Sequence, residues 1–235
     1  MWCFEILASI CFGYEIVRTL ATTSFDALQR LFCGAVIGFI ANSWIVFILS
    51  FFFGLTAFCG FLSITIMFIS TFLMRKYNEK NNKHTSFIFH LTDFQLFTYI
   101  FFGIIYFIFM YASQFYGYTK SKGAGFSDMP FHLNIINSFS VGCNNKRDKM
   151  FNILTAFYSG TQLVYPFIPN FHAALLMATG LTSARYAMLI PSVFIVFSLI
   201  IALYSLIFYF TKSHLACFIG LIIFTNLGGL GWTHV

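Results

Sequence analysis

Charge is what this sequence has least of. Asp, Glu, Lys and Arg make up only 9% of its 235 residues, whereas 59% are hydrophobic. A soluble domain carries about 25% charged residues, so this composition excludes an ordinary soluble domain and predicts an integral membrane protein. The net charge of +6 arises from Lys and Arg residues scattered through the loops. Cations there help to set membrane topology, so this charge does not indicate a nucleic-acid partner.

Cysteine pairs with metal-binding spacing are also missing. None of the six cysteines belongs to a CxxC or CxxH pattern, which excludes a zinc-finger module. Only Cys143 lies in a polar stretch. The other five lie in apolar segments, where a thiol behaves as a small hydrophobic group: Cys3, Cys11, Cys33, Cys59 and Cys217. A disulfide framework is therefore not expected.

Long apolar runs are abundant and predict an all-α, polytopic bundle of about six or seven transmembrane helices in a single domain, residues 1–235. Gly34 and Gly38 would allow close approach of a neighbouring helix. Gly54 is expected to turn the chain into a tight hairpin. The predicted spans are 2–20, 31–53, 55–74, one within 87–116, 163–179, 187–210 and 215–230. The glycine-rich end after the last span suggests a C-terminal truncation.

A long polar loop, about residues 117–162, interrupts these spans. Residues 129–142 are expected to form a helix of about three turns, with Pro130 in its first turn. That helix is too short to cross a bilayer and suits the membrane interface. If the basic run 75–84 is cytoplasmic, a single crossing places the polar loop on the extracytoplasmic side, although the loop itself carries five basic residues.

Three of the four prolines fall within residues 125–170. Two of them, together with Asn170 and His172, break the segment 163–179, which is either a span with an irregular start or a re-entrant segment. Irregular backbone at membrane depth survives only where protein or water satisfies it. We therefore expect Tyr165, Asn170 and His172 to line a cavity.

The pattern S-D-M-P-F-H-L-N-I-I-N-S-F at residues 127–139, followed by G-T-Q-L-V-Y-P-F-I-P-N-F at 160–171, resembles the GT-C glycosyltransferase superfamily. That superfamily includes polytopic enzymes that use dolichyl- or polyprenyl-phosphate sugars. The resemblance implies an acidic catalytic residue in an extracytoplasmic loop beside an interfacial helix. Asp128 is the residue that matches it, with His132 as its neighbour.

Such a transfer needs a base for the acceptor hydroxyl and polar or cationic groups for the phosphate leaving group. Asp128 is assigned as the base, His132 as its partner, and Lys146, Arg147 and Lys149 as ligands of the donor phosphate. A divalent cation, Mg²⁺ or Mn²⁺, would bind at Asp128. Simpler roles stand beside these: Asp128 as a helix N-cap, His132 as an interfacial histidine, His172 as a packing residue and the basic cluster as a solvated or headgroup-contacting loop.

The predicted function is sugar transfer from a lipid-phosphate-linked donor to an acceptor on the lumenal or extracytoplasmic side. The partners are the bilayer and that donor. The location is the endoplasmic reticulum in a eukaryote and the plasma membrane in a prokaryote. The alternatives are a multi-span transporter or lipid scramblase, in which the proline-broken region lines a substrate path, and a non-catalytic membrane subunit or fragment.

Overall fold

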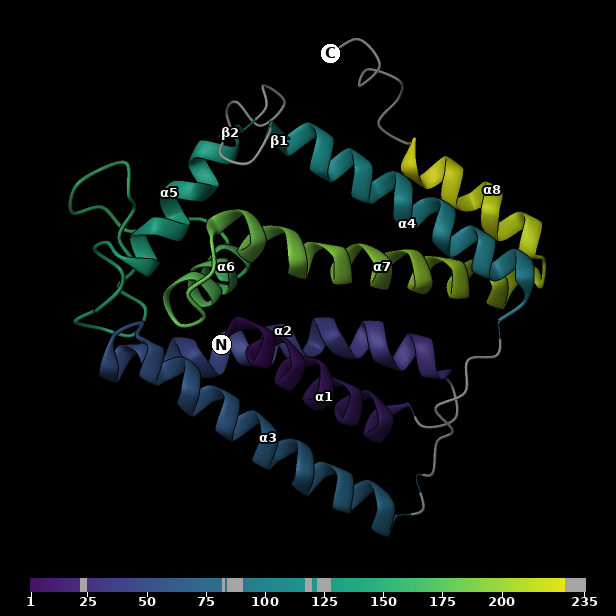
Figure 1. The fold of residues 1–235 in the computed structure, drawn as a ribbon, viewed down its shortest axis with the longest axis horizontal. Coiled ribbons are helices and arrows are strands. Elements are labelled where there is room, and N and C mark those ends of the chain that lie inside the picture. Colours follow the sequence, from purple (N-terminus) through teal and green to yellow (C-terminus); the bar gives the residue numbers. More distant parts are fainter. Residues whose placement is uncertain (22–24, 82, 84–90, 117–119, 122–127, 227–235) are drawn as a thin grey trace.

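The computed structural model describes residues 1–21, 25–81, 83, 91–116, 120–121 and 128–226, and only the backbone of 109–116, 120–121 and 128. Within this part the chain is all-α, apart from one two-stranded ribbon (Figure 1). The helices are α1 (Trp2–Leu20), α2 (Ala27–Phe53), α3 (Ala57–Lys80), α4 (Asp93–Gln114), α5 (Asp128–Ser140), α6 (Ile168–Ala178), α7 (Ala184–Thr211) and α8 (His214–Thr225). Strands β1 (Phe115–Tyr116) and β2 (Lys120–Ser121) pair in antiparallel fashion.

Local signals account for several helix ends. Asp26 caps α2 in a capping box, since its carboxylate accepts from the backbone N–H of Gln29 while the Gln29 side chain accepts from the backbone N–H of Asp26. The helix stops at Gly54, whose positive φ of 71° favours glycine. Pro130 lies in the first turn of α5, as predicted, and Pro169 lies in the first turn of α6.

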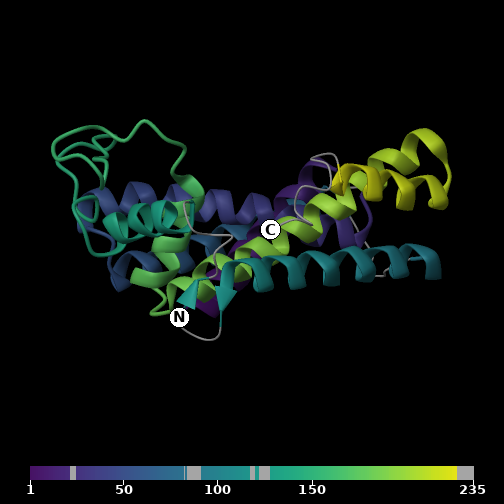
Figure 2. The same cartoon turned by 90° about the horizontal axis from the view of Figure 1, so that it is seen from above.

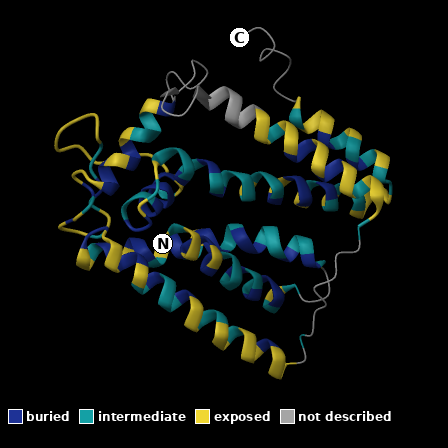
Figure 3. Ribbon diagram, in the orientation of Figure 1, coloured by how far each residue is buried: buried dark blue, intermediate teal, exposed yellow. Residues whose placement is uncertain are grey.

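Three helices, α2, α3 and α7, are long and apolar enough to cross a membrane. The total of six or seven crossings stays a prediction. The segment 163–179 does not form one span, because its helix α6 has only 11 residues. At a rise of about 1.5 Å per residue, α6 covers roughly half of the ~30 Å hydrocarbon core. Large apolar side chains such as Phe61 and Leu73 are exposed on α3 (Figure 3), where lipid tails would cover them.

Helix α1 packs against α2 through glycine. A Cβ atom built on Gly38 would lie 1.8 Å from the carbonyl oxygen of Ser9, and one on Gly13 would lie 1.8 Å from that of Gly34. The predicted close approach at Gly34 and Gly38 is therefore confirmed. The predicted tight hairpin is correct only at its turn. Helices α2 and α3 diverge from Gly54, and α1 packs against both of them (Figure 1).

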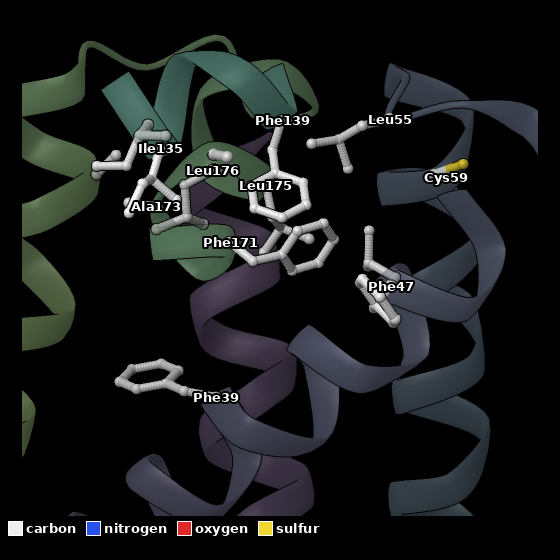
Figure 4. Close-up of a cluster of buried hydrophobic side chains, with 14 of the residues drawn as sticks. Phe39, Phe47, Leu55, Cys59, Ile135, Phe139, Phe171, Ala173, Leu175 and Leu176 are labelled. Atoms are coloured by element: carbon white, nitrogen blue, oxygen red, sulfur yellow. The ribbon is translucent and has the colours of Figure 1, made fainter. Parts of the chain in front are cut away.

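The helices α5 and α6 gather with loop 141–167 at one end of the bundle, where α2 ends and α7 begins (Figures 1 and 2). The last turn of α3 and the start of α8 lie at the opposite end. A cluster of buried side chains that includes Phe47, Phe139 and Phe171 joins α2, α5 and α6 (Figure 4). A second cluster joins α4, α7 and α8 around Tyr99 and Tyr204. The first cluster fixes α5 and α6 over the spans.

Candidate functional site

A pocket of about 290 Å³ lies between α2 and α7, beneath α5 and α6. Its walls are mainly apolar. Ile40 of α2 and Ile195 of α7 line it, and these two side chains are 49% and 47% exposed on the outer surface. The pocket therefore opens beside the outward faces of two helices that can cross a membrane. The polar side chains in its wall are Ser43, His132, Asn170, His172 and Ser192.

His172 is held by α2. Its Nδ1 atom lies 2.9 Å from the Ser43 hydroxyl oxygen, and that hydroxyl donates to the Phe39 carbonyl at 2.8 Å. A hydroxyl has one proton; with that proton on the Phe39 carbonyl, the Nδ1–H of His172 is the donor to Ser43. The neutral ring then carries its free lone pair on Nε2, and this atom is buried without a hydrogen-bond partner in the described part of the chain.

Burial also determines the charge of this imidazole. His172 is 6% exposed, and the loss of hydration lowers its pKa from 6.5 to about 4. The ring is thus neutral near pH 7. A neutral imidazole with Nδ1 protonated presents only a hydrogen-bond acceptor on its other side.

His132 and Asn170 form a second polar pair in the same pocket wall. The Nδ1 atom of His132 lies 3.0 Å from Oδ1 of Asn170, so α5 and α6 are joined by this bond. Tyr165 lies beside the pair, with its ring 4.9 Å from that of Phe131 and 6.1 Å from that of His132. Of the three residues predicted to line a cavity, Asn170 and His172 lie in the pocket wall. Tyr165 is not one of the lining residues; it contacts His132, which is in the wall, and Phe131, the neighbour of His132 on α5.

Asp128, the predicted catalytic acid and metal ligand, is the first residue of α5. Its side chain lies outside the described residues. The backbone places it one turn before His132, so both residues share one face of the helix. Among the residues whose side chains are described, no group of three or more His, Cys, Asp or Glu residues could hold a metal ion. A metal at Asp128 stays a prediction.

The three predicted phosphate ligands differ in their surroundings. Lys146 and Lys149 are exposed in loop 141–167. Arg147 is 6% exposed, and its guanidinium donates to the Phe47 carbonyl (3.0 Å), the Ser50 hydroxyl (3.0 Å) and the Asn144 carbonyl (3.1 Å). It also lies over the Phe47 ring, 4.3 Å from its centroid. Arg147 therefore fastens the loop to α2, and the two lysines carry the accessible charge.

One polar contact near this end was not expected from the sequence. Glu5 of α1 is 1% exposed and contacts the hydroxyl of Thr179, which directly follows α6. The same hydroxyl lies 2.7 Å from the Leu175 carbonyl. The Thr179 hydroxyl thus has two acceptors, the Leu175 carbonyl and Oε1 of Glu5, and the other carboxyl oxygen of Glu5, Oε2, is buried without a hydrogen-bond partner in the described part of the chain. The sequence shows Glu5 as an acid within the apolar first predicted span. Its position near the start of that span is typical of a charge at the membrane surface, so its burial was not predicted.

Comparison with protein-family models, with curated protein sequences and with solved structures finds no match to this chain. In the part of the chain that the structure describes, the fold and the site define an all-α protein with three helices able to span a membrane and an apolar pocket under two short helices.

Proposed function

We propose that this protein is a membrane-embedded transferase that moves a sugar from a lipid-phosphate-linked donor to an acceptor, at the end of the bundle that carries α5 and α6. The acceptor oxygen attacks the anomeric carbon directly. The bond from that carbon to the phosphate oxygen breaks, and the lipid phosphate leaves with the electron pair. Asp128 takes the proton of the acceptor hydroxyl.

The observation that carries this proposal is the position of the His132–Asn170 pair in the wall of a pocket that opens between α2 and α7. A lipid chain must reach the site from the bilayer, and exposed Ile40 and Ile195 at the pocket suit that route for the apolar chain, whereas the phosphate of the donor lies outside the pocket. The fixed imidazole of His132 lies one turn from Asp128 on α5. Lys146 and Lys149, exposed in the loop after α5, supply the charge that a phosphate group requires.

The test is sugar transfer by the purified chain in lipid vesicles. Radiolabelled polyprenyl-phosphate mannose and glucose serve as donors, and label that leaves the lipid phosphate is counted. Asp128→Asn should abolish transfer, whereas Asp93→Asn should preserve it. Asp93 is a matched control because it is also the first residue of a helix, α4, and that helix begins at the opposite end of the bundle (Figure 1).

Unchanged turnover in Asp128→Asn would overturn the assigned role. If the wild-type chain moves the labelled donor across the vesicle membrane without cleaving it, the protein is a transporter or scramblase and the transferase proposal is wrong.

A further inference from the structure

The pocket has an unusual balance of hydrogen-bonding groups. Its described lining residues include no Lys, Arg, Asp or Glu. The hydroxyl protons of Ser43 and Ser192 are both used within the protein, on the carbonyls of Phe39 and Met188. Asn170 bonds to His132 through Oδ1, so its side-chain amide N–H is the donor group that the pocket wall keeps. A phosphate or carboxylate requires several donors or a cation to replace its hydration. The pocket therefore does not suit the charged head of a lipid phosphate.

One acceptor, by contrast, is left over. His172 lies in the pocket wall, and its buried Nε2 has no partner within the described structure. Buried acceptors in native proteins are satisfied by a donor from protein, water or ligand. A ligand that fits here brings a donor of its own.

From these contacts we infer that the pocket binds the hydroxyl end of a neutral, membrane-dissolved lipid alcohol, with its O–H donated to Nε2 of His172. A volume of about 290 Å³ lies at the small end of ligand pockets, so it holds the hydroxyl and the adjoining part of the chain. The rest of the chain passes between Ile40 and Ile195 into the bilayer. In the proposed sugar transfer this alcohol would be the acceptor, and in that respect the inference rests on the proposed function. The phosphate of the donor then lies outside the pocket.

The test is a binding measurement that needs no sugar donor. A long-chain alcohol with a diazirine group is photo-crosslinked to the chain in lipid nanodiscs, and crosslinked peptides are identified by mass spectrometry. Dodecanol and methyl dodecyl ether compete with the probe, each at an equal concentration in the membrane. The two competitors share an apolar chain and an oxygen, but only the alcohol can donate a hydrogen bond.

For the wild-type chain we expect crosslinks in residues 36–43 and 187–195, and about fivefold stronger competition by the alcohol, the effect of one net hydrogen bond. His172→Phe keeps a ring but removes the acceptor, so alcohol and ether should compete equally. His214→Phe is the matched control, because His214 is also held through Nδ1, at 2.6 Å from the hydroxyl of Tyr204, a residue of the other cluster. This variant should keep the preference for the alcohol.

Equal competition by alcohol and ether in the wild-type chain would overturn the inference even if His172→Phe does not fold, since a water molecule would then satisfy Nε2. A preference for the alcohol that persists in His172→Phe would overturn it as well. If the chain binds the alcohol selectively but transfers no sugar in the vesicle assay, the proposed function is wrong and the inference stands. If it transfers sugar but does not bind the alcohol selectively, the inference is wrong and the proposed function stands.

Discussion

Ser43 of α2 and His172 of α6 are joined by a hydrogen bond of 2.9 Å, although 129 positions separate them in the chain. The same Ser43 hydroxyl donates to the Phe39 carbonyl, so α2 determines which nitrogen of the imidazole is protonated. This bond connects a helix that can span the membrane to a short helix that cannot.

Removing the hydroxyl should destabilise the fold. Ser43→Ala leaves the buried Nδ1–H of His172 without an acceptor, which costs about 1–3 kcal/mol of unfolding free energy. Unfolding in mixed detergent micelles measures it. Ser192→Ala is the control, because among the described residues that hydroxyl bonds only to Met188, within its own helix, and its loss should change stability by less than about 0.5 kcal/mol. Equal effects would show that the contact between α2 and α6 contributes nothing.

Gly38→Ala should separate α1 from α2. The new methyl group would meet the Ser9 carbonyl at 1.8 Å, and rigid backbone cannot move aside cheaply, so we expect a loss of about 1–3 kcal/mol. At Gly220 in α8 the nearest atom is the flexible end of Ile207, at 2.6 Å. Gly220→Ala should therefore be neutral or stabilising through helix propensity. Thermal unfolding of the two variants decides, and equal losses would contradict the packing argument.

Features set by local chemistry could be predicted from the sequence. The turn at Gly54 and the short helix after Asp128 both follow from residues within a few positions of one another. Small residues on one helical face likewise indicated the contact of α2 at Gly34 and Gly38, though not its partner, α1.

Burial of charge could not be predicted, because it depends on which distant helix lies opposite. Glu15 and Arg18 lie near the end of the predicted span 2–20, a position typical of charges that reach the membrane surface. They are instead 7% and 8% exposed and paired at 3.3 Å, with Asn78 of α3 donating to the carboxylate at 2.8 Å. For the same reason, Arg147 could not be distinguished from the two exposed lysines beside it.

Arg147→Ala should loosen loop 141–167. Three hydrogen bonds from a charged group disappear, and the expected loss is about 2 kcal/mol together with faster proteolytic cleavage of the loop. Lys146→Ala is the matched neighbour, exposed and expected to stay within about 0.5 kcal/mol of the wild type. Proteolysis of the two variants in micelles gives the comparison. Slow cleavage of Arg147→Ala would show that the loop is held by other contacts.

Glu5 offers a test of its protonation state. The Thr179 hydroxyl has the Glu5 carboxyl oxygen Oε1 and the Leu175 carbonyl as acceptors, and the side-chain amide oxygen of glutamine can accept the same bond without a buried charge. We therefore expect Glu5→Gln to unfold within about 1 kcal/mol of the wild type and Glu5→Ala to lose about 2–4 kcal/mol, since it leaves a cavity. A large loss in Glu5→Gln would indicate that the native carboxyl is charged.

The stability of the fold should depend on pH through His172. Its pKa falls to about 4 on folding, from 6.5 in the unfolded chain, because burial removes hydration from the charged ring. Above pH 6.5 the ring is neutral in both states and has no effect. As the pH falls from 6.5 towards 4, the unfolded chain binds a proton that the folded chain refuses, so stability declines by up to about 3 kcal/mol. His172→Phe should lose this part of the pH dependence. Unfolding free energies of both chains between pH 7 and pH 4 measure the difference, and parallel curves would mean that the imidazole is hydrated in the folded protein.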